Sequence, residues 1–435
     1  MNSYYINNDL KPLIVCRRYS GMHNNNLWKS SGIPAIFKLI ERLESHSISA
    51  TVLFFDTNRV IHKKGNELQF NSFGDKFKFV RILSYTSQYY DNKISFLKYT
   101  VEWIKKIKTI ISLYERYDCN IMYIDRSNLS FAAILSLFKY KVLWRCLGVA
   151  PYHLRKESRK IHMRLLYMID SFFLMMPISL TICTLDGSPW KSILKRMWWR
   201  KRLIVIPNGV DKTSIDNNYI SYIKNFYDLK SSFVITFIGR LENSKNIFEL
   251  LHALNDLKEN SINFRALICG YGSLSDQVIK FIDKNNLDNF VKIVGRVEHR
   301  NVGSYIYASD VVVSVAQAGS LTNVTLESLS IGSCVLTLES DKLSGINIDV
   351  DNFVPKKIMV RINRKNIRHS LYSNIKILIE NKNLIKTYKE ESRKFVIRSV
   401  KKWDDRLDFE IYAMDRVLNN CITKRFIKES NFYNI

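Results

Sequence analysis

An arginine and a lysine follow a hydrophobic stretch in the second half of the chain, in a pattern that suits binding of a diphosphate. Residues Phe233–Ile238 are predicted to form a buried strand. Gly239 and Arg240 come directly after it, and Lys245 stands at the predicted start of a helix. Backbone N–H groups at a helix start and two fixed cations can together neutralise phosphate oxygens without a metal ion. The pattern therefore predicts a diphosphate site at this turn.

Three more turns of this kind follow predicted strands in the same half. One contains Gly270 and Gly272, one contains Arg296, and one runs from Gly319 to Glu327. Ligands of open parallel sheets bind beyond the carboxyl ends of the strands, so the four turns are expected to form one crevice. The carboxylate of Glu327, on a helix next to this crevice, could accept hydrogen bonds from sugar hydroxyls. Together these features indicate a nucleotide-sugar site.

Hydrophobic runs alternate with amphipathic segments along nearly the whole chain, which is typical of α/β layers. A turn with Pro207, Asn208 and Gly209 separates two such series and is the predicted hinge. The predicted strands are Leu13–Arg17, Ala50–Phe55, Phe77–Leu83, Ile121–Ile124, Lys141–Cys146, Leu180–Cys183, Leu203–Ile206, Phe233–Ile238, Arg265–Cys269, Val291–Val294, Val311–Val315 and Cys334–Leu338.

The charge of the chain is strongly positive and uneven. The net charge is +26, and residues 1–205 hold 33 Lys and Arg against 14 Asp and Glu. Such a basic half suits anionic lipid headgroups, pyrophosphate-linked lipids or nucleic acid. A compositional bias toward Lys, Asn and Ile is the alternative. The basic, Trp-containing segment from Trp190 to Arg202 could rest on an anionic membrane or pack on a domain core.

The seven cysteines are scattered, without a CxxC pair, which argues against a zinc site and a disulfide framework. We expect reduced, mostly buried thiols and no metal site. No signal peptide and no apolar window long enough to span a membrane are evident. We therefore expect a cytoplasmic protein, peripheral on the inner face of the cytoplasmic membrane.

The order and spacing of the turns resemble those of the retaining nucleotide-sugar glycosyltransferases of family four. Members have the GT-B architecture, an α/β fold of two Rossmann-like domains facing across a cleft. The resemblance covers residues 203–345 well and the rest only in layout. It implies an acceptor-binding domain over 1–207, a donor-binding domain over 208–400, and a helix over 401–435 that packs back toward the first. The matching residues are Val205–Asp211, Gly239–Leu241 with Lys245 and Asn246, Gly270–Gly272, Val294–Gly295, Tyr305–Asp310, and Asn323–Leu329 with Gly332.

The resemblance also implies roles for individual residues. Arg240 and Lys245 would bind the donor diphosphate in place of a metal, and Glu327 would accept a hydrogen bond from the nucleotide ribose. The other implied donor-binding residues are Gly239, Gly270, Gly272, Arg296, Gly319, Ser320, Asn323, Val324 and, from the first domain, Gly32. One departure stands out, because the family has a glutamate near the donor sugar at the position of Gly319.

On the acceptor side, Arg145 could bind a phosphate, and His153 is either a site residue or a surface-loop histidine. The implied activity is retaining hexosyl transfer without a metal cofactor, from a UDP- or GDP-linked sugar. The expected acceptor is a lipid-linked oligosaccharide in the synthesis of a surface polysaccharide such as O-antigen, lipopolysaccharide, capsule or exopolysaccharide.

Three alternatives stay open at the level of sequence. A catalytically silent GT-B protein that binds a nucleotide or glycan is favoured by Gly319. A sugar-nucleotide epimerase of the same shape would need paired acidic residues and a histidine, which we do not find. A nucleic-acid binder is suggested by charge alone, and we expect no nucleic-acid partner.

Overall fold

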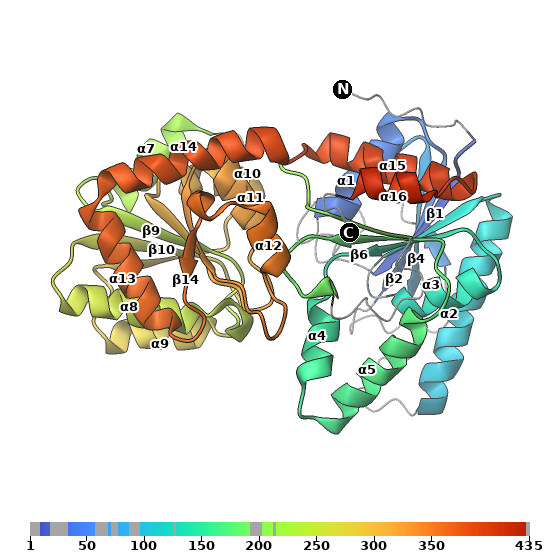
Figure 1. The fold of residues 1–435 in the computed structure, drawn as a ribbon, viewed down its shortest axis with the longest axis horizontal. Helices are drawn as coiled ribbons and strands as arrows, with labels where there is room; N and C mark the ends of the chain where they lie inside the picture. The colour runs from blue at the N-terminus through green and yellow to red at the C-terminus, as the bar shows by residue number, and fades with distance from the viewer. Residues whose placement is uncertain are drawn as a thin grey trace. The chain divides into compact units, whose positions relative to one another are not determined.

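The computed structural model describes residues 9–17, 34–56, 68–70, 77–86, 96–125, 128–191, 202–211 and 215–431. The chain forms two compact units (Figure 1). Unit 1 comprises Met1–Thr184, Trp190–Ile206 and Trp403–Ile435, and unit 2 comprises Leu185–Pro189 and Pro207–Lys402. One boundary lies between Ile206 and Pro207, inside the predicted hinge. A five-residue segment within the first half, Leu185–Pro189, belongs to unit 2, which the sequence did not indicate.

Unit 1 contains an eight-stranded sheet in the order β3-β4-β2-β1-β5-β6-β7-β8. All neighbouring strands are parallel except β3, which is antiparallel to β4. Strands β5 to β8 are buried at every position, as expected when helices cover both faces of a parallel sheet. The strands are β1 (Pro12–Arg17), β2 (Ala50–Asp56), β3 (Leu68–Phe70), β4 (Val80–Thr86), β5 (Ile121–Asp125), β6 (Val142–Cys146), β7 (Leu180–Thr184) and β8 (Leu203–Ile206).

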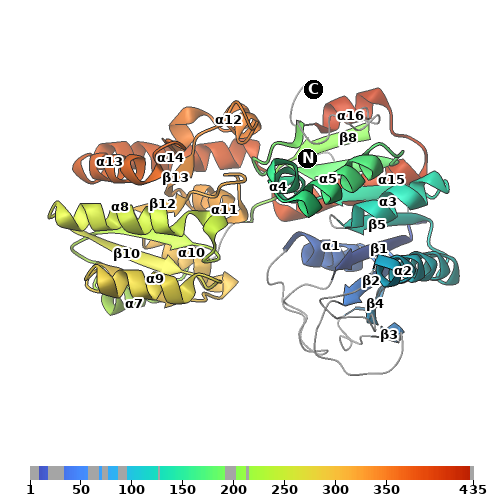
Figure 2. The ribbon, with the colours of Figure 1, turned by 90° about the horizontal axis from the view of Figure 1, so that it is seen from below.

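The helices of unit 1 come from both ends of the chain. They are α1 (Pro34–Ser45), α2 (Phe96–Arg116), α3 (Leu129–Leu137), α4 (Ala150–Glu157), α5 (Ile161–Leu174), α15 (Trp403–Leu418) and α16 (Lys424–Ser430). Helix α15 lies beside α1 (Figures 1 and 2). Leu407 and Met414 of α15 share a buried core with Ile36 and Ile40 of α1, so the last helices complete the first unit.

Unit 2 contains a six-stranded parallel sheet in the order β11-β10-β9-β12-β13-β14. Its strands are β9 (Phe233–Ile238), β10 (Phe264–Cys269), β11 (Val291–Gly295), β12 (Val311–Ser314), β13 (Cys334–Leu338) and β14 (Val360–Ile362). Its helices are α7 (Asn217–Phe226), α8 (Ile247–Glu259), α9 (Ser275–Lys284), α10 (His299–Tyr307), α11 (Asn323–Ile331), α12 (Ile348–Phe353), α13 (Ile367–Glu380) and α14 (Lys382–Ser399).

The predicted α/β class with two Rossmann-like parallel sheets is confirmed. The short strands β3 and β14 were missed, because three-residue strands carry little periodicity. Helices α4 and α5 are separate, since Ser158 has extended backbone angles and ends α4. All seven cysteines are free, and all but Cys421 are buried.

Candidate functional site

The candidate site lies at the carboxyl edge of the unit 2 sheet, beginning with the turn after β9. Gly239 and Arg240 follow the strand, and a single 3-10 turn, η5 (Asn243–Lys245), precedes α8. Asn246 joins the two with a left-handed backbone (φ 52°), which is why the helix begins two residues later than predicted. Its buried side chain donates to Val315 O at 2.8 Å, which fixes the turn against the end of β12.

Arg240 and Lys245 lie near each other on this turn. The Arg240 side chain is 74% exposed and pairs with Glu242, at 2.7 Å between Nη1 and Oε1. Burial lowers the pKa of Lys245, and the Arg240 guanidinium lowers it further, while Glu242 and Asp186 act in the opposite direction. Two neighbouring cations, one of which lowers the pKa of the other, favour a ligand with at least two negative charges. A diphosphate meets this requirement.

Glycines let the neighbouring strand ends approach this turn closely. Gly270 N donates to Gly295 O at 2.7 Å, and a Cβ on Gly270 would lie 1.8 Å from Gly239 O. A Cβ on Gly272 would lie 2.4 Å from Leu241 O. The predicted glycines are therefore needed for close backbone contact among three turns, and the structure brings them together.

The turn into α11 contains three further predicted residues. Thr322 caps the helix by accepting from Thr325 N at 3.2 Å, and Thr325 Oγ1 donates to Ser320 O at 2.7 Å. Asn323 and Val324 occupy the first two helical positions, whose N–H groups have no acceptor inside a helix. Their N–H groups are therefore at the position that the predicted role as backbone donors requires, and the role itself stays a prediction.

Glu327 lies one turn further along α11 and has a partner that the sequence did not reveal. His299, at the start of α10, lies 3.1 Å from it, between Nε2 and Oε1. The Glu327 side chain is 16% exposed, whereas that of His299 is 68% exposed. A histidine held against the carboxylate can fix its orientation. No spacing in the sequence predicted this pair, because the two residues lie on different helices.

The position of Gly319 has no room for a side chain. A Cβ there would lie 2.4 Å from Asp186 O and 3.0 Å from Ser188 N. The segment Leu185–Pro189 is held in this place by two hydrogen bonds, from Leu321 N to Asp186 O (3.0 Å) and from Asn347 N to Gly187 O (2.8 Å). The glutamate that the family has at this position therefore could not fit without moving the segment.

The same segment brings an acidic side chain to the site. Asp186 Oδ1 accepts from Ser188 N at 2.8 Å and from Ser188 Oγ at 2.5 Å. Burial raises the pKa of Asp186, and the bonds from Ser188 and the charge of Lys245 oppose that rise. The residue as a whole is half-buried. Asp186 thus adds an electrostatic partner for Lys245 that we did not predict.

Four further residues were predicted for the site. Arg296 is exposed just after β11. Arg145 does not fit an acceptor-phosphate role, because its side chain is fully buried and its Nε donates to Glu410 at 2.8 Å. His153 is not a loop residue, since it lies in α4 and is buried. Gly32 lies outside the described residues.

Of the proposed membrane segment, residues 192–201 lie outside the described part of the chain, and Trp190 is buried. No helix among the described residues has the length and apolarity needed to cross a membrane. In the same part of the chain, no three His, Cys, Asp or Glu side chains gather closely enough to hold a metal ion.

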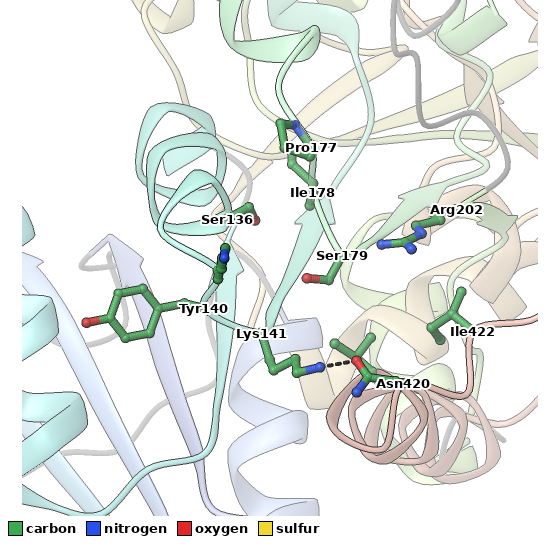
Figure 3. Close-up of a pocket in the computed structure, with 11 residues that line it drawn as sticks. Ser136, Tyr140, Lys141, Pro177, Ile178, Ser179, Arg202, Asn420 and Ile422 are labelled. Atoms are coloured by element: carbon green, nitrogen blue, oxygen red, sulfur yellow. Dashed lines mark hydrogen bonds between the residues drawn. The ribbon is translucent and has the colours of Figure 1, made fainter.

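A cavity of about 210 Å³ lies in unit 1, away from the carboxyl ends of its strands (Figure 3). Lys141, Ser179 and Arg202 line it, and they directly precede β6, β7 and β8. Lys141 Nζ donates to Asn420 Oδ1 across one side. Because ligands of such sheets bind at the opposite edge, this cavity is not a candidate for the donor site.

Comparison with known proteins places similarities mainly in unit 2. Residues 223–395 match the family model described as glycosyl transferases group 1. The chain is 26% identical over 172 residues to an uncharacterised glycosyltransferase of Methanocaldococcus jannaschii, covering 38% of this chain and 41% of that protein. It is 24% identical over 143 residues to the alpha-monoglucosyldiacylglycerol synthase of Acholeplasma laidlawii, covering 31% and 36%. The chain thus spans less than half the length of these relatives.

The fold as a whole has solved counterparts. The Anabaena protein HepE, solved in complex with UDP and glucose, matches with a TM-score of 0.65 at 17% identity, over 93% of this chain and 98% of that one. The family match covers β9 to β13 and the turns that carry Arg240, Lys245 and Glu327. Residues 223–395 of unit 2 are thus similar to the glycosyl transferases group 1 family, in a chain whose two Rossmann-like units have the GT-B fold.

Proposed function

We propose that this protein is a glycosyltransferase that moves a hexose from a UDP- or GDP-linked donor to a lipid-linked oligosaccharide, with retention of configuration. One observation carries the proposal: Arg240 and Lys245 converge on glycine-rich turns at the carboxyl edge of the unit 2 sheet. Their charges would stabilise the leaving nucleoside diphosphate, so that no metal ion is required. Glu327, oriented by His299, would accept from the ribose.

The donor class is supported by structures of similar fold, among them HepE in complex with UDP and glucose. The lipid-linked acceptor is supported by the name of the Acholeplasma relative, whose product is a glycolipid. We place the reaction on the inner face of the cytoplasmic membrane, in surface polysaccharide synthesis. The basic first half of the chain suits an acceptor with an anionic lipid phosphate.

The first test is a thermal-shift measurement with UDP, GDP, ADP and CMP in the presence of a metal chelator. A bound nucleotide stabilises the folded state in proportion to the logarithm of its concentration over its dissociation constant. We expect one diphosphate to raise the Tm of the wild type and not that of Arg240→Ala. The matched control is Arg368→Ala, which removes an arginine paired with Asp256 on the same unit. No shift with any diphosphate would refute the proposal.

The alternative is a catalytically silent nucleotide-binding protein, which Gly319 favours. Binding alone does not separate the two functions. Release of free hexose from the bound nucleotide sugar, measured without acceptor, does separate them, because a silent protein cannot cleave the glycosidic bond. We expect slow hydrolysis by the wild type, and its loss in Lys245→Ala.

A further inference from the structure

Helix α5 carries a stripe of exposed apolar side chains on its outward face. Ile161, Leu165, Met168, Ile169 and Phe172 are between 49% and 77% exposed. They recur at spacings of three and four residues, so they share one face of the helix. Surface helices of globular domains normally present polar residues on this side.

The opposite face of α5 already packs on unit 1. Tyr167, Ser171 and Leu174 are buried there, so the exposed stripe is a second apolar face. Leu154 of α4 is also 57% exposed. Helices α4 and α5 contact each other and diverge from a turn that lies away from the sheet (Figure 1).

Basic side chains surround the turn between these helices. Lys156, Arg159, Lys160 and Arg164 are exposed, against one exposed acid, Glu157. The nearby carboxylate of Asp170 is paired with Arg155 and does not offset them. A cationic rim next to an apolar stripe is the pattern of a helix that lies in a membrane interface.

We propose that the α4–α5 face, defined by this stripe and this basic rim, binds the surface of an anionic lipid bilayer. The stripe would enter the acyl boundary while the cations contact lipid phosphates. A second copy of the chain fits less well, because a two-fold contact through this face would bring two basic rims together. The proposal extends the proposed function by a docking surface, but its evidence does not depend on the donor site.

The test is sedimentation of the purified protein with vesicles of phosphatidylcholine that contain or lack phosphatidylglycerol. The variant Leu165→Gln/Met168→Gln/Phe172→Gln removes three exposed side chains and should fold. We expect it to lower binding to the anionic vesicles on the order of tenfold or more. Lys156→Gln/Arg159→Gln/Lys160→Gln should lower the same binding by a similar factor, with a smaller effect on neutral vesicles.

The matched control is Leu343→Gln/Ile377→Gln/Ile397→Gln, which removes three exposed apolar side chains from unit 2 and should bind like the wild type. Equal binding by all variants, or no vesicle binding by the wild type, would overturn the proposal. A wild-type dimer that the α5 variant abolishes, without vesicle binding, would instead assign the face to a second copy. Nucleotide-induced Tm shifts should be the same in all variants, which keeps this result separate from that of the donor site.

A second inference concerns Asp186 and rests on the proposed function. The charge of its carboxylate acts to raise the pKa of Lys245, which shows that the two side chains are close. A carboxylate repels phosphate oxygens, so within the donor it suits the uncharged hexose rather than the diphosphate. The residue also lies against Gly319, where no side chain fits. We infer that Asp186 accepts hydrogen bonds from hydroxyl groups of the donor hexose and thereby holds the sugar beside its diphosphate.

Asp186→Asn tests this inference, because an asparagine Oδ1 can still accept both bonds from Ser188 while the negative charge is lost. The probes are UDP with UDP-glucose and GDP with GDP-mannose, and the pair whose diphosphate stabilises the wild type is used. We expect affinity for the nucleotide sugar to fall about tenfold or more and affinity for the diphosphate to stay or rise. The control Asp283→Asn removes an exposed carboxylate from α9 of the same unit and should bind both ligands like the wild type.

A parallel loss of both ligands, or of neither, would overturn the role of Asp186 while the proposed donor site stands. Wild-type protein that binds no diphosphate at all would refute the proposed function, and the inference would fall with it.

Discussion

The two units each gather two cations around acidic groups, and the two clusters differ in how completely the charges are enclosed. In unit 1, Glu410 accepts from Arg145 Nε at 2.8 Å and lies 2.6 Å from Arg406 Nη1, and no side chain of the three is more than 3% exposed. In unit 2, Arg240 is 74% exposed, and Lys245 has no carboxylate within ion-pair distance in the described part of the chain. The first cluster is enclosed by the protein, and the second is open to solvent at Arg240.

The pKa directions agree with this division. Burial acts to raise the pKa of Glu410, but Arg145 and Arg406 outweigh it and lower that pKa overall. Burial lowers the pKa of Lys245, and its acidic neighbours do not restore it. The closed cluster of Arg145, Arg406 and Glu410 therefore keeps its charges through internal partners. The open cluster of Arg240 and Lys245 would gain from a ligand that supplies the missing negative charge.

The largest effect is expected when the closed cluster is broken. Glu410→Gln leaves two buried guanidinium groups without their carboxylate, which typically costs about 3–5 kcal/mol. We expect the free energy of unfolding, measured in urea, to fall by that amount. The control is Glu429→Gln on α16, an exposed partner of Arg425, with a change near zero. Equal midpoints for both variants would contradict the structural role of the closed cluster.

The open cluster depends instead on close backbone contact. Gly319→Ala would place a methyl group 2.4 Å from Asp186 O, and we expect a loss of about 1–3 kcal/mol in the stability of unit 2. Gly319→Glu introduces the glutamate that family-four glycosyltransferases have at this position, and it should be at least as destabilising. Gly239→Ala is the control, because its Cβ would meet nothing closer than 3.6 Å. Limited proteolysis and thermal unfolding would measure the difference, and a Gly319→Glu variant as stable as the wild type would contradict it.

Removing a cation from the open cluster should affect binding rather than folding. We expect Lys245→Ala to weaken binding of the stabilising diphosphate at least tenfold, since a charge-assisted hydrogen bond contributes about 1.5–3 kcal/mol. Without ligand its stability should equal or exceed that of the wild type, because the ammonium is partly desolvated. Lys292→Ala is the control, a lysine whose Nζ donates to Asp288 O on the same unit. A fall in ligand-free stability as large as that of Glu410→Gln would contradict the contrast between the clusters.

The sequence predicted the open cluster and not the closed one, for a physical reason. Arg240, Lys245 and the glycines lie at successive strand ends, and chain order alone brings strand ends together in a parallel sheet. Glu410 and Arg145 are 265 positions apart, and only packing of α15 on the sheet joins them. For the same reason Arg145 was predicted to bind an acceptor phosphate. Asp186 was missed because its segment belongs to unit 2 although its neighbours in the chain belong to unit 1.

The smallest expected effect is a pH dependence that separates Lys245 from an ordinary lysine. Its pKa in the folded protein lies below 10.5, and a diphosphate binds the protonated form. Affinity for the diphosphate should therefore be greatest at neutral pH and should fall as the pH rises through the lowered pKa of Lys245. This fall should come at a lower pH than the loss of charge from a lysine with an ordinary pKa. Lys245→Arg keeps the charge throughout this range, and titration of the ligand itself is common to both proteins. Isothermal titration calorimetry should show the wild type losing affinity relative to Lys245→Arg as pH rises. Parallel curves would mean that the ammonium does not contact the diphosphate, and the open cluster would then bind through Arg240 alone.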